Sequence, residues 1–159
     1  MNTQVVSIAQ MFVTDDVNDM IITYSLGSCL GVSAYDPVAG VGGMIHCLLP
    51  TSRSNPEKAK LNPSMYTDTG MVELFNGLFN LGASKENLKI KVAGAGAPMD
   101  MGEQFRIGER NFAVLRKFLW KNNILIDGQD VGGKKPRTLT LDMATGRTMV
   151  KTKGAETEL

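Results

Sequence analysis

The chain has 159 residues, of which 43% are hydrophobic and 21% charged, and its formal net charge is +1. These values fit one folded domain and exclude a disordered chain, which would be poorer in apolar residues and more strongly charged. The basic residues are scattered, so the sequence predicts no nucleic-acid partner. No apolar run approaches the ~20 residues that span a bilayer, so direct membrane insertion is not expected.

The N-terminal segment lacks a basic leader and meets acidic residues early, so we expect a cytoplasmic protein. In a reducing compartment Cys29 and Cys47 should be free thiols. Two cysteines and one histidine, His46, are too few for a zinc site of the usual Cys/His type. The sequence therefore predicts no metal and no cofactor.

The first third of the chain predicts strands, because short apolar runs alternate there with polar turns. These strands are expected at residues 4–13, 20–25, 30–35 and 41–49. Asp36, Pro37 and Gly40 have the composition of a turn, so the third and fourth strands should form a hairpin. Its turn should centre near residue 38 or 39, and a bulge at Gly42 and Gly43 could adjust the register.

Two main helices follow a polar loop at residues 51–63, and further strands complete the chain. The helices are expected at residues 64–81, with Gly82 as a C-terminal cap, and at residues 108–122. Their predicted apolar faces are Met65, Thr69, Val72, Phe75 and Phe79 in the first helix, and Phe112, Leu115, Leu119 and Trp120 in the second. The later strands are expected at residues 88–94, 124–131, 137–143 and 147–152, with a loop from Gly94 to Gly102.

These elements predict an α+β fold in a single domain, residues 1–159, with layered β-sheets and two main helices. We see no domain boundary or internal repeat. Residues 153–159 are expected to be a flexible tail.

The residues best suited to chemistry are His46 and Cys29. Cys29 follows Leu26, Gly27 and Ser28 at the junction of two strand-like runs. Glycine permits tight backbone geometry at such a junction, and the peptide N–H groups around a kink can point at one spot. We therefore expect a nucleophile at Cys29, with Gly27 and Ser28 forming an oxyanion or substrate-binding site.

In the predicted hairpin, residue 29 lies opposite residue 47 or 48, so His46 is a cross-strand or diagonal neighbour of Cys29. An adjacent imidazole can activate a thiol that is otherwise mostly protonated at neutral pH. Cys47 should face away from the partner of His46, because adjacent strand residues point to opposite faces. A third group commonly orients the imidazole, and Thr23 is the candidate, with Ser25 and Ser28 as alternatives.

Two segments resemble the signature of the CheD family: residues 23–36, TYSLGSCLGVSAYD, and residues 42–50, GGMIHCLLP. The resemblance continues in residues 105–111, FRIGERN, and in DVGG at residues 130–133, followed by Pro136 and Arg137. Together these motifs extend the resemblance from about residue 5 to 152.

The resemblance implies a protein-glutamine amidohydrolase that deamidates specific glutamines on the cytoplasmic part of chemoreceptors. It implies a Cys–His–Thr constellation at Cys29, His46 and Thr23, and a fold similar to the catalytic domain of the cytotoxic necrotizing factor toxins. It also implies a possible partner, a CheC-type phosphatase.

The chain departs from the family pattern at two places. Cys47 stands where a large apolar residue is expected, and residues 92–99 lack an expected phenylalanine. The second departure bears on partner binding or substrate fit. The alternative function is a regulatory module that binds a CheC-type phosphatase with little or no catalysis.

Overall fold

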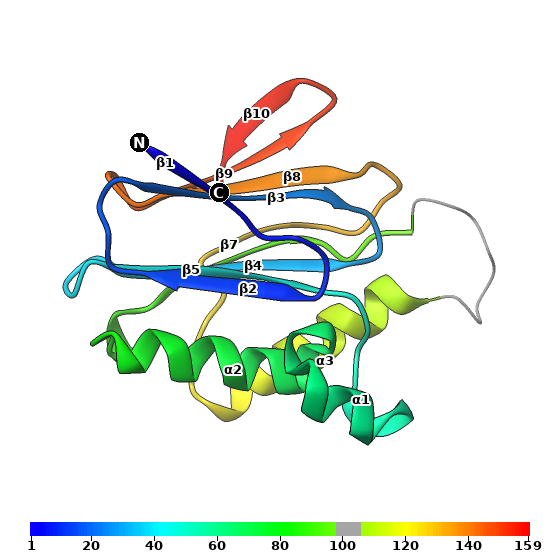
Figure 1. The fold of residues 1–159 in the computed structure, drawn as a ribbon. Helices are drawn as coiled ribbons and strands as arrows, with labels where there is room; N and C mark the ends of the chain where they lie inside the picture. Colours follow the sequence, from blue (N-terminus) through cyan, green and yellow to red (C-terminus); the bar gives the residue numbers. More distant parts are fainter. Residues whose placement is uncertain (98–105) are drawn as a thin grey trace.

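Two β-sheets stack face to face, and helices cover the outer face of one of them, so the α+β prediction is confirmed (Figure 1). The computed structural model describes residues 1–97 and 106–159. The predicted loop from Gly94 to Gly102 thus lies partly outside the described residues. The helices are α1 (Pro56–Leu61), α2 (Thr67–Asn80) and α3 (Ile107–Lys121).

Each sheet has five strands. The outer sheet runs in the order β1 (Asn2–Val5), β3 (Asp19–Leu26), β8 (Arg137–Asp142), β9 (Arg147–Thr152) and β10 (Ala155–Glu158). The central sheet, which lies against the helices, runs in the order β2 (Gln10–Thr14), β5 (Val41–Cys47), β4 (Leu30–Asp36), β6 (Lys89–Gly94) and β7 (Gly128–Val131). The pairs β1–β3 and β6–β7 are parallel, and the other pairs are antiparallel.

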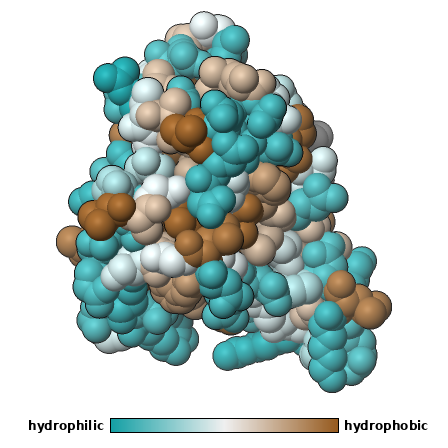
Figure 2. Space-filling model, turned by 60° about the vertical axis from the view of Figure 1, so that its left-hand side comes forward, coloured by the Kyte–Doolittle hydropathy of each residue, from teal (hydrophilic) through white to brown (hydrophobic). Residues whose placement is uncertain are grey.

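Two hydrophobic cores result, one between the sheets and one between the central sheet and the helices. Nearly all of β4 and all of β5 are buried, because layers cover both of their faces. On the face that Figure 2 shows, hydrophobic surface occurs in separate areas divided by hydrophilic side chains. Isolated exposed apolar residues of this kind are ordinary for a folded domain. No helix among the described residues is long and apolar enough to cross a membrane.

Strands β4 and β5 form the expected hairpin, in continuous register from Leu30 opposite Cys47 to Asp36 opposite Val41. This register centres the turn between residues 38 and 39, as predicted, and it contains no bulge at Gly42 and Gly43. The buried Asp36 carboxylate accepts backbone hydrogen bonds from Val38, Ala39 and Ser84. Burial alone would raise the pKa of Asp36, but these bonds outweigh it and lower that pKa. The ionised side chain therefore fixes the turn.

The predicted first strand, residues 4–13, is wrong as a single element. The structure divides it into β1 in the outer sheet and β2 in the central sheet. The chain crosses between the sheets at residues 6–9, where Ala9 has a positive φ of 63°. No glycine or proline marks this crossing, so the alternating pattern gave no sign of the break.

The last residues correct a second expectation. Residues 155–158 are not a flexible tail, because they form β10 and pair antiparallel with β9. Lys153 and Gly154 have positive φ values of 50° and 81°, and this tight turn folds the chain back on itself.

The predicted helices exist, but their buried faces are rotated from the expected ones. In α2, Val72 and Phe79 are 48% and 39% exposed, and the buried residues are Thr67, Gly70, Met71, Leu74, Phe75 and Leu78. In α3, Trp120 is 78% exposed, whereas Asn111 lies buried on the same stripe as Leu115 and Leu119. Gly82 has the positive φ of 105° that its predicted capping position requires.

Two smaller differences concern loops. The predicted loop at residues 51–63 contains α1 and the turn Ser52–Ser54, and a second short turn, Pro63–Met65, begins at its end. A third such turn spans Lys85–Asn87. The strand expected at 124–131 begins only at Gly128, after Asn123 leaves α3 with a positive φ of 58°.

Candidate active site

His46 lies on β5, in the middle of the molecule, and its side chain points from the central sheet toward the outer sheet. The register places Gly31 of β4 opposite it. Its imidazole reaches Thr23 on β3, a strand of the other sheet. The ring is almost fully buried, with a residue exposure of 1%. Both sheets therefore contribute to the position of the imidazole.

The hydrogen bonds of Thr23 fix the tautomer of His46. Thr23 Oγ1 lies 2.6 Å from the carbonyl oxygen of Val6 and 2.7 Å from His46 Nδ1. A carbonyl oxygen can only accept hydrogen bonds, so Thr23 must donate its single hydroxyl proton in the bond to Val6. His46 Nδ1–H must then donate to Thr23 Oγ1, and Nε2 of the neutral ring carries the lone pair.

Nε2 is thus the nitrogen that can act as a base. It is buried and has no hydrogen-bond partner among the described residues. Burial also lowers the pKa of His46 from 6.5 to about 4. The imidazole is therefore neutral at physiological pH and able to accept a proton at Nε2.

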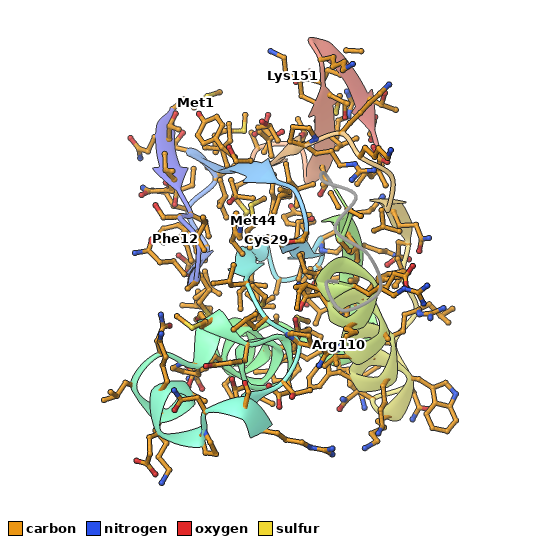
Figure 3. All side chains as sticks on the ribbon, turned by 90° about the vertical axis from the view of Figure 1, so that its right-hand side faces the viewer. Met1, Phe12, Cys29, Met44, Arg110 and Lys151 are labelled. Carbon is orange, nitrogen blue, oxygen red and sulfur yellow. The ribbon has the colours of Figure 1, made fainter. Side chains whose placement is uncertain are left out.

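Cys29 lies in the same core between the sheets as Met44, which precedes His46 by two positions on the same face of β5 (Figure 3). Cys29 directly precedes β4, whose first pairing places Leu30 opposite Cys47, the residue after His46. Cys29 belongs to the core between the sheets, and His46 is directed into the same layer by its contact with Thr23 of the outer sheet. Among the described residues no hydrogen bond joins the thiol to Nε2.

Cys29 is 7% exposed, and burial raises the pKa of its thiol, although its own backbone N–H acts to lower it. Both shifts favour the neutral forms of the Cys29 thiol and of the His46 imidazole at rest. Proton transfer to Nε2 would accompany attack by the sulfur, as general-base catalysis requires.

Three consecutive carbonyl groups anchor the turn that carries Cys29. The carbonyl of Gly27 accepts from the Gly96 N–H at 2.8 Å, and that of Cys29 accepts from the Ala95 N–H at 2.7 Å. The carbonyl of Ser28 accepts from the Asn111 side-chain amide at 3.0 Å. In a trans peptide the C=O and N–H groups point in opposite directions. These anchors therefore also fix the directions of the Ser28 and Cys29 N–H groups.

The backbone N–H groups of Ser28 and Cys29 differ from that of Gly27 in their hydrogen bonding. Gly27 N–H donates to the Ser25 carbonyl at 3.0 Å, so Gly27 shapes the turn and offers no free donor. Within residues 1–97 and 106–159, no backbone carbonyl accepts from the Ser28 or Cys29 N–H. Of the predicted oxyanion residues, only Ser28 has an N–H that donates to no backbone carbonyl of the described residues. The Cys29 N–H, which is directed toward its own thiol, also donates to none.

Other predicted candidates lie elsewhere. Ser25 is exposed, with a φ of 59°, in the irregular stretch of β3 between Thr23 and Leu26. Thr23, rather than Ser25 or Ser28, is the hydroxyl that contacts His46. Cys47 faces the helices from the other core, and burial raises the pKa of its thiol to about 12. That thiol is therefore unreactive at neutral pH.

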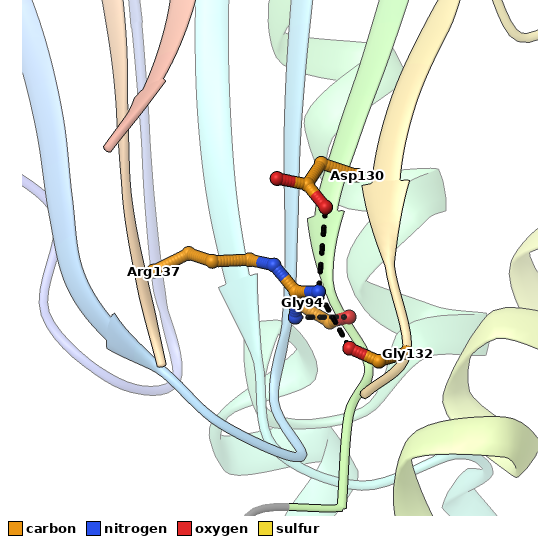
Figure 4. Close-up of polar contacts among 4 residues, drawn as sticks. All are labelled: Gly94, Asp130, Gly132 and Arg137. Carbon is orange, nitrogen blue, oxygen red and sulfur yellow. Dashed lines mark hydrogen bonds and ion pairs between the residues drawn. The ribbon is translucent and has the colours of Figure 1, made fainter. Parts of the chain in front are cut away.

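Arg137 clamps the backbone that anchors Cys29. Its guanidinium donates to the carbonyls of Gly94 at 3.3 Å and Gly132 at 2.5 Å, and it pairs with Asp130 at 3.3 Å (Figure 4). Gly94 directly precedes Ala95, whose N–H holds the Cys29 carbonyl. This buried cation thus joins β6, β7 and β8 next to the turn.

Sequence reasoning missed two residues of this site. Val6 supplies only a carbonyl oxygen, and nothing in a sequence marks such a role. Asn111 gave a usable sign, because it is a polar residue four and eight positions before Leu115 and Leu119, on an apolar helical stripe. A polar side chain on such a stripe indicates a buried hydrogen-bonding role.

A buried cysteine and a tautomer-fixed histidine, between the sheets of an α+β domain, define a site of the kind that cysteine-dependent acyl-transfer enzymes use. The family model described as CheD chemotactic sensory transduction matches residues 48–152. The chain belongs to the CheD family.

Curated relatives extend over nearly the whole chain. The probable chemoreceptor glutamine deamidase CheD 1 of Syntrophus aciditrophicus is 44% identical over 154 residues, covering 97% of this chain and 96% of that protein. The probable chemoreceptor glutamine deamidase CheD of Solibacter usitatus is 40% identical over 155 residues, covering 98% and 92%.

Among solved structures, a Neisseria meningitidis protein of the DUF152 family matches 84% of this chain with a TM-score of 0.47 and 11% identity. The match covers 63% of that protein, so this chain spans less than two thirds of its length. The expected similarity to the cytotoxic necrotizing factor catalytic domain stays a prediction.

Proposed function

We propose that this chain is a protein-glutamine amidohydrolase that converts specific glutamines of chemoreceptors to glutamates. Cys29 is the nucleophile, His46 the base and Thr23 the group that orients the imidazole. One observation carries the proposal: the hydroxyl of Thr23, bonded to Val6, leaves His46 Nε2 as an unpartnered, buried base in the same inter-sheet space as Cys29. The names of the curated relatives support the substrate class.

The reaction proceeds in two steps. The Cys29 sulfur attacks the glutamine carboxamide carbon while the thiol proton moves to His46 Nε2. The N–H groups of Ser28 and Cys29 donate to the oxyanion. The C–N bond then breaks, His46 returns the proton to the leaving nitrogen, and ammonia departs from a thioester. His46 next takes a proton from water, whose oxygen attacks the thioester carbon. The C–S bond then breaks, His46 returns the proton to the Cys29 sulfur, and glutamate and the free thiol result.

The proposal is tested with a receptor cytoplasmic fragment, ammonia release and peptide mass spectrometry. Wild type should convert specific glutamines to glutamates, and Cys29→Ala should abolish the conversion. Cys47→Ala is the matched control, because it removes the other thiol from the opposite core and should leave the turnover of folded protein unchanged. Normal deamidation by folded Cys29→Ala protein would falsify the assignment.

The proposed substrate places this action in the cytoplasm. The second proposed partner, a CheC-type phosphatase, rests on the family resemblance. Binding of such a phosphatase should survive Cys29→Ala, since the substitution removes one buried sulfur and no surface. A pull-down in which wild type captures no CheC-type phosphatase would remove this partner and leave the amidase proposal intact.

A further inference from the structure

Asn111 joins the two halves of the proposed site through one side chain. Its amide nitrogen donates to the Ser28 carbonyl at 3.0 Å and to the Leu48 carbonyl at 3.3 Å. Its amide oxygen lies 3.4 Å from Thr67 Oγ1, whose single hydroxyl proton is shared with the nearer Leu49 carbonyl oxygen at 3.2 Å. The residue is completely buried in the first turns of α3. The amide nitrogen of Asn111 therefore donates to two backbone carbonyls of the proposed site.

The two carbonyls belong to the segments that carry the proposed catalytic pair. Ser28 directly precedes Cys29, and Leu48 follows His46 by two residues. Strand β5 ends at Cys47, so the Leu48 carbonyl marks the point where the chain leaves the sheet. A single rigid amide thus sets the distance between the Cys29 turn and the end of the His46 strand.

Asn111 also differs in kind from the other anchors of the turn. The carbonyls of Gly27 and Cys29 are held by backbone N–H groups of Gly96 and Ala95. Among residues 1–97 and 106–159, a side chain holds only the Ser28 carbonyl of these three. Because the Ser28–Cys29 peptide is planar and trans, holding this oxygen directs the Cys29 N–H the opposite way. That N–H is one of the two proposed oxyanion donors.

We propose that Asn111 is a positioning residue, which sets the Cys29 N–H and thiol relative to His46 Nε2. The inference rests on the proposed function for its kinetic consequence. The hydrogen bonds of Asn111 go to Ser28, Leu48 and Thr67, so it acts through the backbone of the neighbours of Cys29 and His46. Its loss should therefore lower kcat far more than it alters KM.

The test compares Asn111→Ala with Asn122→Ala. Asn122 caps the other end of α3 and also donates from its amide to a backbone carbonyl, that of Phe118 at 2.8 Å. Asn111→Ala should lower kcat about 10- to 100-fold, part of the ~10²–10⁴-fold that a positioned acid–base group contributes, with KM within about twofold. Asn122→Ala should keep the wild-type kcat. Equal kcat values in the two folded variants would overturn the inference.

A second readout does not depend on turnover. The rate at which iodoacetamide alkylates Cys29, followed by mass spectrometry of its peptide, should change severalfold in Asn111→Ala and stay unchanged in Asn122→Ala. Inactive wild-type protein would count against the proposed function, whereas an unchanged Cys29 alkylation rate in Asn111→Ala would count against the positioning role. If the alanine variant does not fold, Asn111→Gln, which retains the amide on a longer stem, should show an intermediate kcat. A wild-type kcat in that variant would contradict the proposal.

Discussion

The hydroxyl of Thr23 has one proton, which it donates in a hydrogen bond to the Val6 carbonyl oxygen. The direction of that one bond decides which nitrogen of His46 is basic. A hydroxyl on β3 therefore sets the tautomer of a histidine on β5, although the two residues belong to different sheets. The same logic makes the backbone of Val6 a part of the site.

Thr23→Val should lower kcat about 10- to 100-fold, because the valine cannot accept the Nδ1 proton and the ring loses its fixed tautomer. Thr23→Ser keeps the hydroxyl and should retain most of the activity. Steady-state kinetics on a receptor fragment would compare the two. Equal activity in folded Thr23→Val and Thr23→Ser would show that the hydroxyl does not orient the imidazole.

The lowered pKa of His46 predicts acid sensitivity. Between its ordinary pKa of 6.5 and its folded value of about 4, the unfolded chain binds a proton that the folded protein does not. The folded state therefore loses stability as pH falls through this window, by roughly 3 kcal/mol in total. Urea unfolding from pH 7 to pH 4 would measure the loss.

His46→Gln removes this titration and is the matched control. Its stability should fall less steeply between pH 6.5 and 4 than that of wild type. Parallel pH profiles for the two proteins would mean that His46 titrates normally in the folded state.

At the residue scale, the sequence could predict the register of the β4–β5 hairpin that carries His46, whereas the pairing of Cys29 with His46 stays a prediction. The turn at Asp36–Gly40 defines the hairpin register, and register alone decides which side chains share a face. It could not predict the neutral state of the pair, because the depth of burial depends on the outer sheet. The carbonyl oxygen that Val6 contributes could not be predicted either, because its position depends on the path of the backbone.

At the scale of elements, the turn that carries Cys29 depends on a close approach of β6. Gly94 has a φ of 96°, and a Cβ built there would lie 2.4 Å from the Cys29 carbonyl oxygen. Only glycine allows this contact without displacement of the turn.

Gly94→Ala should therefore lower activity at least about tenfold and destabilise the protein by roughly 2 kcal/mol. Gly40→Ala is the control, since Gly40 also has a positive φ, of 68°, but a Cβ there would meet nothing within 4 Å. It should show a smaller stability loss and unchanged kcat. Steady-state kinetics and urea unfolding would compare the two variants. Equal kcat values and equal free energies of unfolding would mean that the close contact between Gly94 and Cys29 affects neither activity nor stability.

Element types were largely predictable, whereas the faces of the helices were not. Periodicity located α2, but Gly70 packs tightly against Ile45 and Cys47, and this close approach rotates the helix from the face that apolar spacing suggested. Trp120 fitted an apolar stripe by composition, yet it lies outside the contact between α3 and the sheet. Side-chain spacing defines a stripe, and only the neighbouring layer decides which stripe is buried.

At the scale of the whole molecule, the C-terminal residues link the two sheets. Leu159 N–H donates to the Thr148 carbonyl at 3.0 Å, and the Leu159 carbonyl accepts from the Lys91 ammonium of β6. The partition of strands between two sheets depends on such non-local contacts. A linear pattern cannot encode it, which is why the crossing after β1 and the pairing of β10 were not predicted.

Removal of residues 155–159 should lower the free energy of unfolding by about 1–2 kcal/mol, because β10 and its link to Lys91 are lost. Thermal unfolding with circular dichroism would measure this. Lys91→Met removes only the link between the sheets and should have part of the effect. An unchanged melting temperature after the truncation would restore the expectation of a flexible tail.

The two strands that flank the proposed reaction, β4 and β5, are covered on both faces. Their amide protons should therefore be among the slowest in the protein to exchange with solvent deuterium, opening only when the entire chain unfolds. Strand β10, whose residues are all exposed, should exchange much sooner. Catalytic competence and global folding then form one cooperative event, and no partly unfolded intermediate should retain turnover.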